Sequence, residues 1–430
     1  MKPSFNAAAI SGASLQQFRS VTDPLADQVV KAIIDSGQEK QINQILMTLV
    51  RNNSFAPGMF ASLGEEISKS LDDYIAESGK LPLWADQTMI KKAERLFELY
   101  GPNIFMLLNV SSLPMCYCCG NGAQVLFDTG RLLASPDGSV DPLARRLMET
   151  GQMIINVLSK GGLSEHGTGV VTLQKVRLIH ASIRFFVKQS PRVWDATTLG
   201  EPINQEDLAG TLMSFGPVIL TGLKRLGVKL DDTETSAWMH TWSIVGKLLG
   251  LDDSLLPDTH QQGFQLATEV LKHQAATSDA GRALTASCVK FMNRMIPGNA
   301  FDDVPVYLMW YFLQDFSKSS GKDLATMIGI EETADIRDKL VLAIANFVNT
   351  AISREDDHDR FVCKIIATFN KVLLQGMIYH VNGGKGVQFV IPPSLQANWG
   401  LVETWKDQAT TPGILGYRIS LQKKSEIINN

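Results

Sequence analysis

The stretch "VRLIHASIR", residues 176–184, places one histidine between two arginines within an otherwise apolar segment. A helix over roughly residues 170–188, turning by about 100° per residue, would gather five side chains along one line: Leu173, Arg177, His180, Arg184 and Val187. The rest of the circumference is mostly apolar, which is typical of a buried helix. Buried guanidinium groups keep their charge and need anionic partners. The pattern therefore predicts that this polar row faces an anionic or polar group inside the protein.

Two kinds of occupant would satisfy the row. Aspartate or glutamate side chains of the protein could neutralise both arginines, with His180 making only hydrogen bonds. A planar, dianionic haem would also fit, because haem iron takes a histidine ligand and a propionate takes an arginine. The residues alone leave both alternatives open.

The segment "DPLARRLMETGQMIINVLSK", residues 141–160, predicts a second helix just before the first. Asp141 suits the N-cap and Pro142 the first helical position. One face combines apolar and polar side chains, a lining typical of a ligand pocket: Leu143, Arg146, Glu149, Thr150, Met153 and Val157. The alternative is a surface Arg146–Glu149 pair at i,i+3 spacing. Because the connection "SKGGLSEHGTG" (159–169) is glycine-rich, we expect the two helices to fold back so that their polar rows face one another.

Helical periodicity runs along almost the whole chain of 430 residues. It is clear over 26–37, 260–274 and 323–352, whereas only "GVQFVI" (386–391) has the pattern of a strand. Apolar residues make up 45% of the chain, enough for a substantial core. We therefore predict one large all-α domain over residues 1–430, with 1–20 and about 418–430 at its periphery.

One long segment, from Leu99 to Phe127, contains no charged residue. A membrane-spanning helix needs about 20 mainly apolar residues, but glycines, prolines and polar residues interrupt this segment. We expect a deeply buried wall that faces a ligand, and no stable membrane insertion.

Charge and cysteine content exclude several classes of protein. The net charge of −4 does not suit a general binder of nucleic acid or anionic membranes. The five cysteines are odd in number and three crowd into "MCYCCG", so they do not form a disulfide framework. Reduced cysteines and the lack of an export signal predict a cytoplasmic protein. No serine-hydrolase elbow, P-loop, dinucleotide fingerprint or zinc-protease motif occurs.

Four phrases carry a family resemblance: "RLMET" (146–150), "KVRLIHASIR" (175–184), "GEPINQEDLAGTLMSFG" (200–216) and "WMHTWSIVGKLLGLDDSLLP" (238–257). In order and spacing, over about residues 23–257, the chain resembles the MpaB/rubber-oxygenase (latex-clearing protein) family. The resemblance implies an all-α fold with a globin-like core that holds haem b and its iron. It also implies an oxidoreductase that uses dioxygen to cleave carbon–carbon double bonds in a hydrophobic, isoprenoid or lipid-like substrate.

Position by position, the resemblance assigns roles to the polar rows. His180 resembles the axial ligand of the haem iron, and Arg177 and Arg184 resemble the arginines beside it, which we expect to neutralise propionates. Arg146 and Thr150 match the ends of a distal Arg-x-x-Lys-Thr motif in the latex-clearing proteins. The sequence departs from that motif in the middle, where Glu149 stands at the lysine position. The upstream glutamate of the family has no clear counterpart; Gly130 stands near its position and Asp128 is the nearest carboxylate.

The departure at Glu149 leaves two functional alternatives. A carboxylate in an apolar pocket beside haem could act as a general base on an allylic proton near neutral pH, so Arg146, Glu149 and Thr150 are the candidate catalytic residues. Alternatively, Glu149 only pairs with Arg146, and the protein is a non-catalytic binder of haem or of a hydrophobic ligand. The lack of an export signal argues against extracellular rubber as the substrate.

The remaining polar candidates have simpler interpretations. His240 lies between two tryptophans at helical spacing and is expected to pack in the core. His166 is expected in a surface loop or lid, and His358 in a solvated charge run. Asn204, with Asp207 three residues on, is expected to cap a helix.

Overall fold

A computed structural model describes residues 5–37, 45, 54–55, 58–129, 141–189, 194–296, 302–331, 369–370, 373–374 and 376–377; within 141–146 it describes the backbone only. This part of the chain is helical and contains no strand, apart from an isolated bridge between Cys119 and Ala275. The predicted all-α class is therefore confirmed. The possible strand at 386–391 and the tail at 418–430 lie outside the described residues.

The helices are α1 (Gly12–Phe18), α2 (Pro24–Asp35), α4 (Glu65–Ser78), α5 (Gln87–Leu107), α6 (Leu113–Cys118), α7 (Gly120–Asp128), α8 (Asp141–Leu158), α9 (Thr168–Lys188), α10 (Ala196–Leu199), α11 (Gln205–Phe215), α12 (Pro217–Arg225), α13 (Asp232–Leu248), α14 (His260–Gln274), α15 (Asp279–Met295), α16 (Val304–Ser320) and α17 (Leu324–Met327). Short 3₁₀ turns occur at Ala7–Ala9, Ala61–Leu63 and Asp253–Leu255, and a π-helical turn spans Leu108–Ser112.

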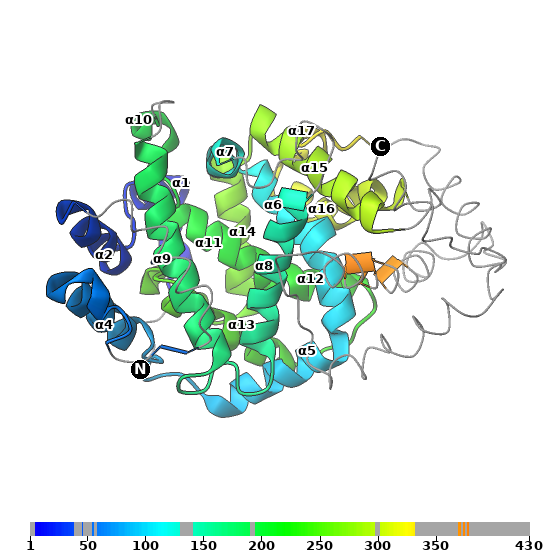
Figure 1. The fold of residues 1–430 in the computed structure, drawn as a ribbon. Helices are drawn as coiled ribbons and strands as arrows, with labels where there is room; N and C mark the ends of the chain where they lie inside the picture. The colour runs from blue at the N-terminus through cyan, green and yellow to red at the C-terminus, as the bar shows by residue number, and fades with distance from the viewer. Residues whose placement is uncertain are drawn as a thin grey trace, which may run out of the picture.

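Two antiparallel helices, α8 and α9, run side by side near the middle of the molecule (Figure 1). On the outer side of α9 lie α2 and α4, which share a small apolar cluster with it. On the other side, α5, α11–α13 and the later helices form the main core. The α9 helix therefore separates two apolar clusters.

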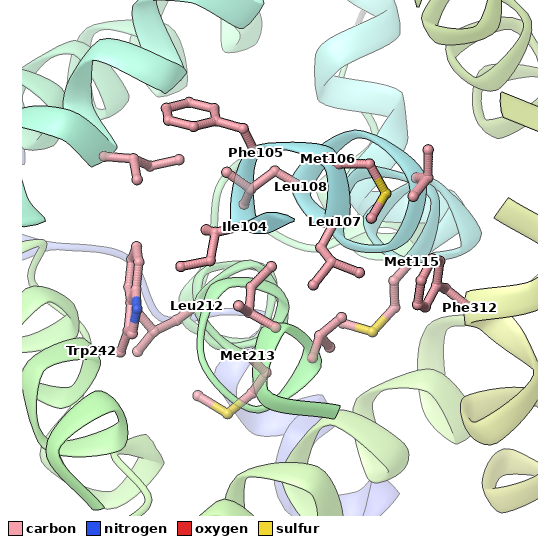
Figure 2. Close-up of a cluster of buried hydrophobic side chains, with 14 of the residues drawn as sticks. Ile104, Phe105, Met106, Leu107, Leu108, Met115, Leu212, Met213, Trp242 and Phe312 are labelled. Carbon is pink, nitrogen blue, oxygen red and sulfur yellow. The ribbon is translucent and has the colours of Figure 1, made fainter. Parts of the chain in front are cut away.

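The main core draws on residues from Phe5 to Met377. Its centre is the uncharged segment 99–127, which forms the end of α5, the π-helical turn, α6 and α7. Figure 2 shows apolar side chains of this segment, among them Ile104, Leu107 and Met115, gathered with Leu212 and Met213 of α11. All five residues of the π-helical turn are buried. The expected buried wall is confirmed for residues 104–112, whereas Leu99 at its start is exposed and its contact with a ligand stays a prediction.

Local capping explains why several helices begin where they do. Thr259 and Asp231 form capping boxes at the starts of α14 and α13, with Gln262 and Glu234 as their partners. The α14 helix, His260–Gln274, coincides with the predicted segment 260–274. In contrast, the helix expected over 323–352 is interrupted, because α17 ends at Met327 and Gly329 adopts a φ of +79°. Residues 332–352 lie outside the described part.

The N-terminal segment requires a correction. Residues 1–20 were expected at the periphery, but Leu15 of α1 is fully buried in the main core, and the Arg19 side chain that follows is buried as well. The reason is that α1 packs its apolar face against α11 and α14. None of the described helices is both long and apolar enough to cross a bilayer.

Candidate functional site

The α8–α9 hairpin carries most of the predicted site, and its turn depends on glycine. Gly169 donates its backbone N–H to the Gly162 carbonyl at 2.9 Å. A methyl group at Gly169 would lie 2.7 Å from that carbonyl oxygen and 2.8 Å from Val157 Cα. Glycine therefore allows the two helices to approach closely at this end. His166, at the tip of the turn, is exposed and has a φ of +58°, which confirms its expected surface position.

A side-chain hydrogen bond sets the register of the hairpin. Asn156 Nδ2 of α8 donates to Thr172 Oγ1 of α9 at 2.9 Å. Because the helices are antiparallel, seven residues back along α8 and seven forward along α9 reach the same level. These positions are Glu149 and Ile179, directly beside His180. By this register Glu149, Thr150 and His180 lie at one level, whereas the expectation that their polar rows face one another stays a prediction.

His180 is half-buried, and its Nδ1 atom is shielded from solvent. On the circumference of α9 it lies between two edges. One edge carries Arg177 and Arg184; the other carries Ile183 and Val187, which pack with Val125 of α7 and with Trp194. His180 therefore stands at the border between the charged and the apolar side of the helix.

The anionic partner of Arg177 is Asp23, immediately before α2. Arg177 Nε and Nη2 donate to the two carboxylate oxygens at 2.6 and 2.7 Å, and Nη1 donates to the Leu248 carbonyl at 3.4 Å. Burial by itself lowers the pKa of Arg177, but the hydrogen bonds and charge of Asp23 outweigh it, so the pKa lies above its usual value. Arg177 is therefore a fully charged member of a buried ion pair.

The anionic partner of Arg184 is Asp27, which lies in the first turn of α2, close to Asp23. Arg184 Nε donates to Asp27 Oδ1 at 2.7 Å, and Nη1 donates to the Ile203 carbonyl at 3.3 Å. For both arginines the structure thus realises the first alternative, in which protein carboxylates neutralise the row. The expected role toward propionates must be revised accordingly, because Asp23 and Asp27 already balance both charges.

On the face of α8 that carries the candidate catalytic residues, burial decreases from Val157 toward the start of the helix. Val157 and Met153 are buried, Thr150 is half-buried and Glu149 is exposed. Glu149 is exposed in the chain by itself, so the expected apolar pocket around it stays a prediction. The Arg146 side chain and Gly130 lie outside the described residues. Asp128, at the end of α7, accepts a hydrogen bond from Gln124 Nε2 at 2.8 Å.

The other polar candidates have structural partners. Asn204 Oδ1 accepts from the Asp207 backbone N–H at 3.0 Å, which confirms it as the cap of α11. His240 is half-buried rather than in the core; its Nε2 accepts from the Asp86 N–H at 2.9 Å and its ring meets Trp84 edge to face. His358 lies outside the described residues.

The cysteines that the structure describes are free, as expected: Cys116, Cys118, Cys119 and Cys288. Burial raises the pKa of Cys288 to about 12 and also raises the pKa of Cys118, so these thiols stay protonated. Among the described side chains no group of three or more His, Cys, Asp or Glu could hold a metal ion. A single histidine on a haem iron needs no such group.

Sequence reasoning missed Asp23 and Asp27. The Asp-Pro pair at 23–24 signals a helix start, with Asp27 one turn later, but nothing in that local pattern links it to arginines more than 150 residues away.

Comparisons with known proteins agree with this architecture. The model of the family "ER-bound oxygenase mpaB/B'/Rubber oxygenase, catalytic domain" matches residues 129–350, just over half of the chain. A rubber oxygenase of Streptomyces sp. (strain K30) is 26% identical over 267 residues, and the match spans 62% of this chain and 62% of that protein, less than two thirds of its length. The structure of latex clearing protein LCP in the closed state aligns with a TM-score of 0.65 and 20% identity, covering 90% of this chain and 100% of that one. At that identity the structural likeness establishes the fold.

The all-α fold and the histidine-bearing α8–α9 hairpin define the chain as a helical domain. The chain belongs to the MpaB/rubber-oxygenase catalytic-domain family.

Proposed function

We propose that this protein is a haem b-dependent oxygenase that acts with dioxygen on a hydrophobic, alkene-bearing substrate of isoprenoid or lipid-like character. Oxidative cleavage of a carbon–carbon double bond is the leading reaction. Family membership supports the oxygenase class. The observation that carries the proposal is the hairpin, which brings half-buried His180 level with Glu149 and Thr150.

His180 fits the role of axial ligand. Its imidazole is half-buried and its Nδ1 atom is shielded from solvent, so Nε2 is the nitrogen that would be offered to a metal. The arginines fit a propionate role less well, because Asp23 and Asp27 already neutralise them. When bound, haem would supply the iron that activates dioxygen.

The residues of the chain would contribute binding, exclusion of water and proton transfer. Ile183 and Val187, packed with Val125 and Trp194, make the side of α9 next to His180 apolar and would help to exclude water there. Thr150 can offer a hydroxyl hydrogen bond at the same level. A carboxylate oxygen of Glu149 would accept an allylic proton, and its exposure lets that proton pass to solvent.

A second candidate function is that of a non-catalytic protein that binds haem or a hydrophobic ligand. The carboxylate partners of both arginines and the exchange of the distal lysine for Glu149 favour it. The cytoplasmic location stays a prediction.

The test is an absorption spectrum of the purified protein after haem reconstitution. We expect a Soret band in the wild type, its loss in His180→Ala, and no change in the control His166→Ala, which alters an exposed histidine. A colourless wild type would overturn haem dependence. Oxygen uptake with polyisoprenoid and unsaturated-lipid panels then separates the oxygenase from the non-catalytic binder.

A further inference from the structure

We propose that Asp23 is a positioning residue for His180, acting through Arg177. This inference rests on the proposed function of His180 as the axial ligand. Arg177 lies almost one turn before His180 on α9, so the direction in which Arg177 is held fixes the rotation of the turn that presents the imidazole. Asp23 would thereby set where His180 stands relative to α8.

The Asp23–Arg177 pair is deeply buried and bidentate. The Asp23 side chain is 3% exposed and that of Arg177 is 11% exposed. Both carboxylate oxygens are used, at 2.6 and 2.7 Å, a geometry that fixes orientation as well as distance. Arg184 and Asp27 form a similar pair on the far side of His180, but Asp27 is 31% exposed. Of the two ion pairs, Asp23–Arg177 is therefore the one that holds its arginine more rigidly.

Asp23 does not cap its own helix, because its side chain pairs with Arg177. It occupies the N-cap position of α2, where an aspartate side chain usually accepts a hydrogen bond from the first turn of its own helix. Its side chain makes no such cap bond, because both oxygens point to Arg177. The local helix signal is thus used for a contact with α9.

The turn after α13 is shaped around the same ion pair. Gly250 has a φ of +86°, and a methyl group there would lie 2.7 Å from Asp23 Oδ2 and 2.8 Å from Arg177 Nε. Arg177 Nη1 also reaches the Leu248 carbonyl at the end of α13. Only glycine leaves room for the pair, which explains why glycine stands at position 250.

Gln205 joins the two backbone segments that enclose the pair. Its Nε2 donates to the Thr22 and Gly250 carbonyls, both at 2.9 Å, and its Oε1 accepts from the Asp252 N–H at 2.8 Å. Gln205 is itself buried. Two of the phrases that carry the family resemblance, "INQED" and "LGLDD", therefore meet at Asp23 and Arg177 and build the support for the helix of His180.

The test compares Asp23→Asn with Asp35→Asn in the haem-loaded full chain. Asp35 lies on the same helix but forms an exposed ion pair with Lys31. For Asp23→Asn we expect haem affinity to fall by roughly tenfold or more, as for other groups that orient a metal ligand. We also expect a shift of the Soret band and of the ferric spin state, with added imidazole restoring the wild-type spectrum. Asp35→Asn should match the wild type in affinity and spectrum.

A folded Asp23→Asn variant with the wild-type Soret band and haem affinity would overturn the inference, even if its melting temperature fell. If Asp23→Asn does not fold, Arg177→Lys decides. It keeps the charge but loses the bidentate geometry, and an unchanged spectrum there would refute the role of the pair. Wild type and His180→Ala are run in parallel. A colourless wild type removes the proposed function and this inference with it. A Soret band that is lost in His180→Ala but unaltered in Asp23→Asn removes the inference alone.

Discussion

Asn156 of α8 and Thr172 of α9 share a 2.9 Å side-chain hydrogen bond that places Glu149 level with the turn of His180. Thr172 Oγ1 also donates to the Thr168 carbonyl at 2.7 Å, so its hydroxyl serves both helices. The relationship between the distal residues and the histidine thus depends on one pair in the hairpin.

Replacing Thr172 with valine should destabilise the hairpin. The variant keeps the side-chain shape but leaves the half-buried Asn156 amide without its acceptor, so we expect the free energy of unfolding to fall by about 1 kcal/mol. Urea denaturation measures this loss. Thr172→Ser keeps the hydroxyl and serves as the control; an equal loss in both variants would mean that the hydrogen bond does not matter.

The substitution Gly169→Ala should lower the stability of the protein considerably more than Thr172→Val does. The added methyl group would lie 2.7 Å from the Gly162 carbonyl oxygen and 2.8 Å from Val157 Cα, both backbone atoms that cannot move without opening the turn. We expect a loss of about 2 kcal/mol or more by thermal or urea unfolding. Gly12→Ala is the matched control, because its methyl group would meet only His273 Cδ2, at an ordinary 3.6 Å. A Gly169→Ala variant as stable as this control would contradict the close approach.

Asp207 should give the protein a pH-dependent stability. Burial raises its pKa to about 6; Arg19 partly opposes the shift and the Glu206 charge adds to it. Since the folded state then holds the proton more tightly than the unfolded state between about pH 4 and pH 6, this group makes stability fall as pH rises through that range and leaves it level above. The effect of a shift of this size is about 3 kcal/mol at most.

Urea unfolding at several pH values between 4.5 and 7.5 tests this. In Asp207→Asn the contribution of this group to the slope should disappear. In the control Asp195→Asn the slope should stay as in the wild type, because hydrogen bonds from Thr197 and Thr198 hold the pKa of the exposed Asp195 at about 2, below the range. Identical slopes in wild type and Asp207→Asn would refute the assignment.

How much of this could be predicted from the sequence depends on the range of each interaction. The α14 helix could be placed to the residue, because its apolar stripe lies within the segment and its N-cap, Thr259, directly precedes it. The partner of Arg177 could not, because it lies 154 residues away and depends on how α2 packs. Periodicity correctly put Glu149 and Met153 on one face of α8. It gave no information on depth, so the exposure of Glu149 could not be predicted.

Because Glu149 is exposed, substituting it should test proton transfer without disturbing the fold. Glu149→Gln removes the basic oxygen but keeps the shape, and a surface substitution of this kind should change stability by less than about 0.5 kcal/mol. If Glu149 is the base, oxygen uptake with an alkene substrate should fall by about 100-fold or more while the Soret band stays. Glu165→Gln, in the exposed hairpin turn, should retain full uptake. Full uptake in Glu149→Gln would assign proton transfer to another group and leave Glu149 with a binding or structural role.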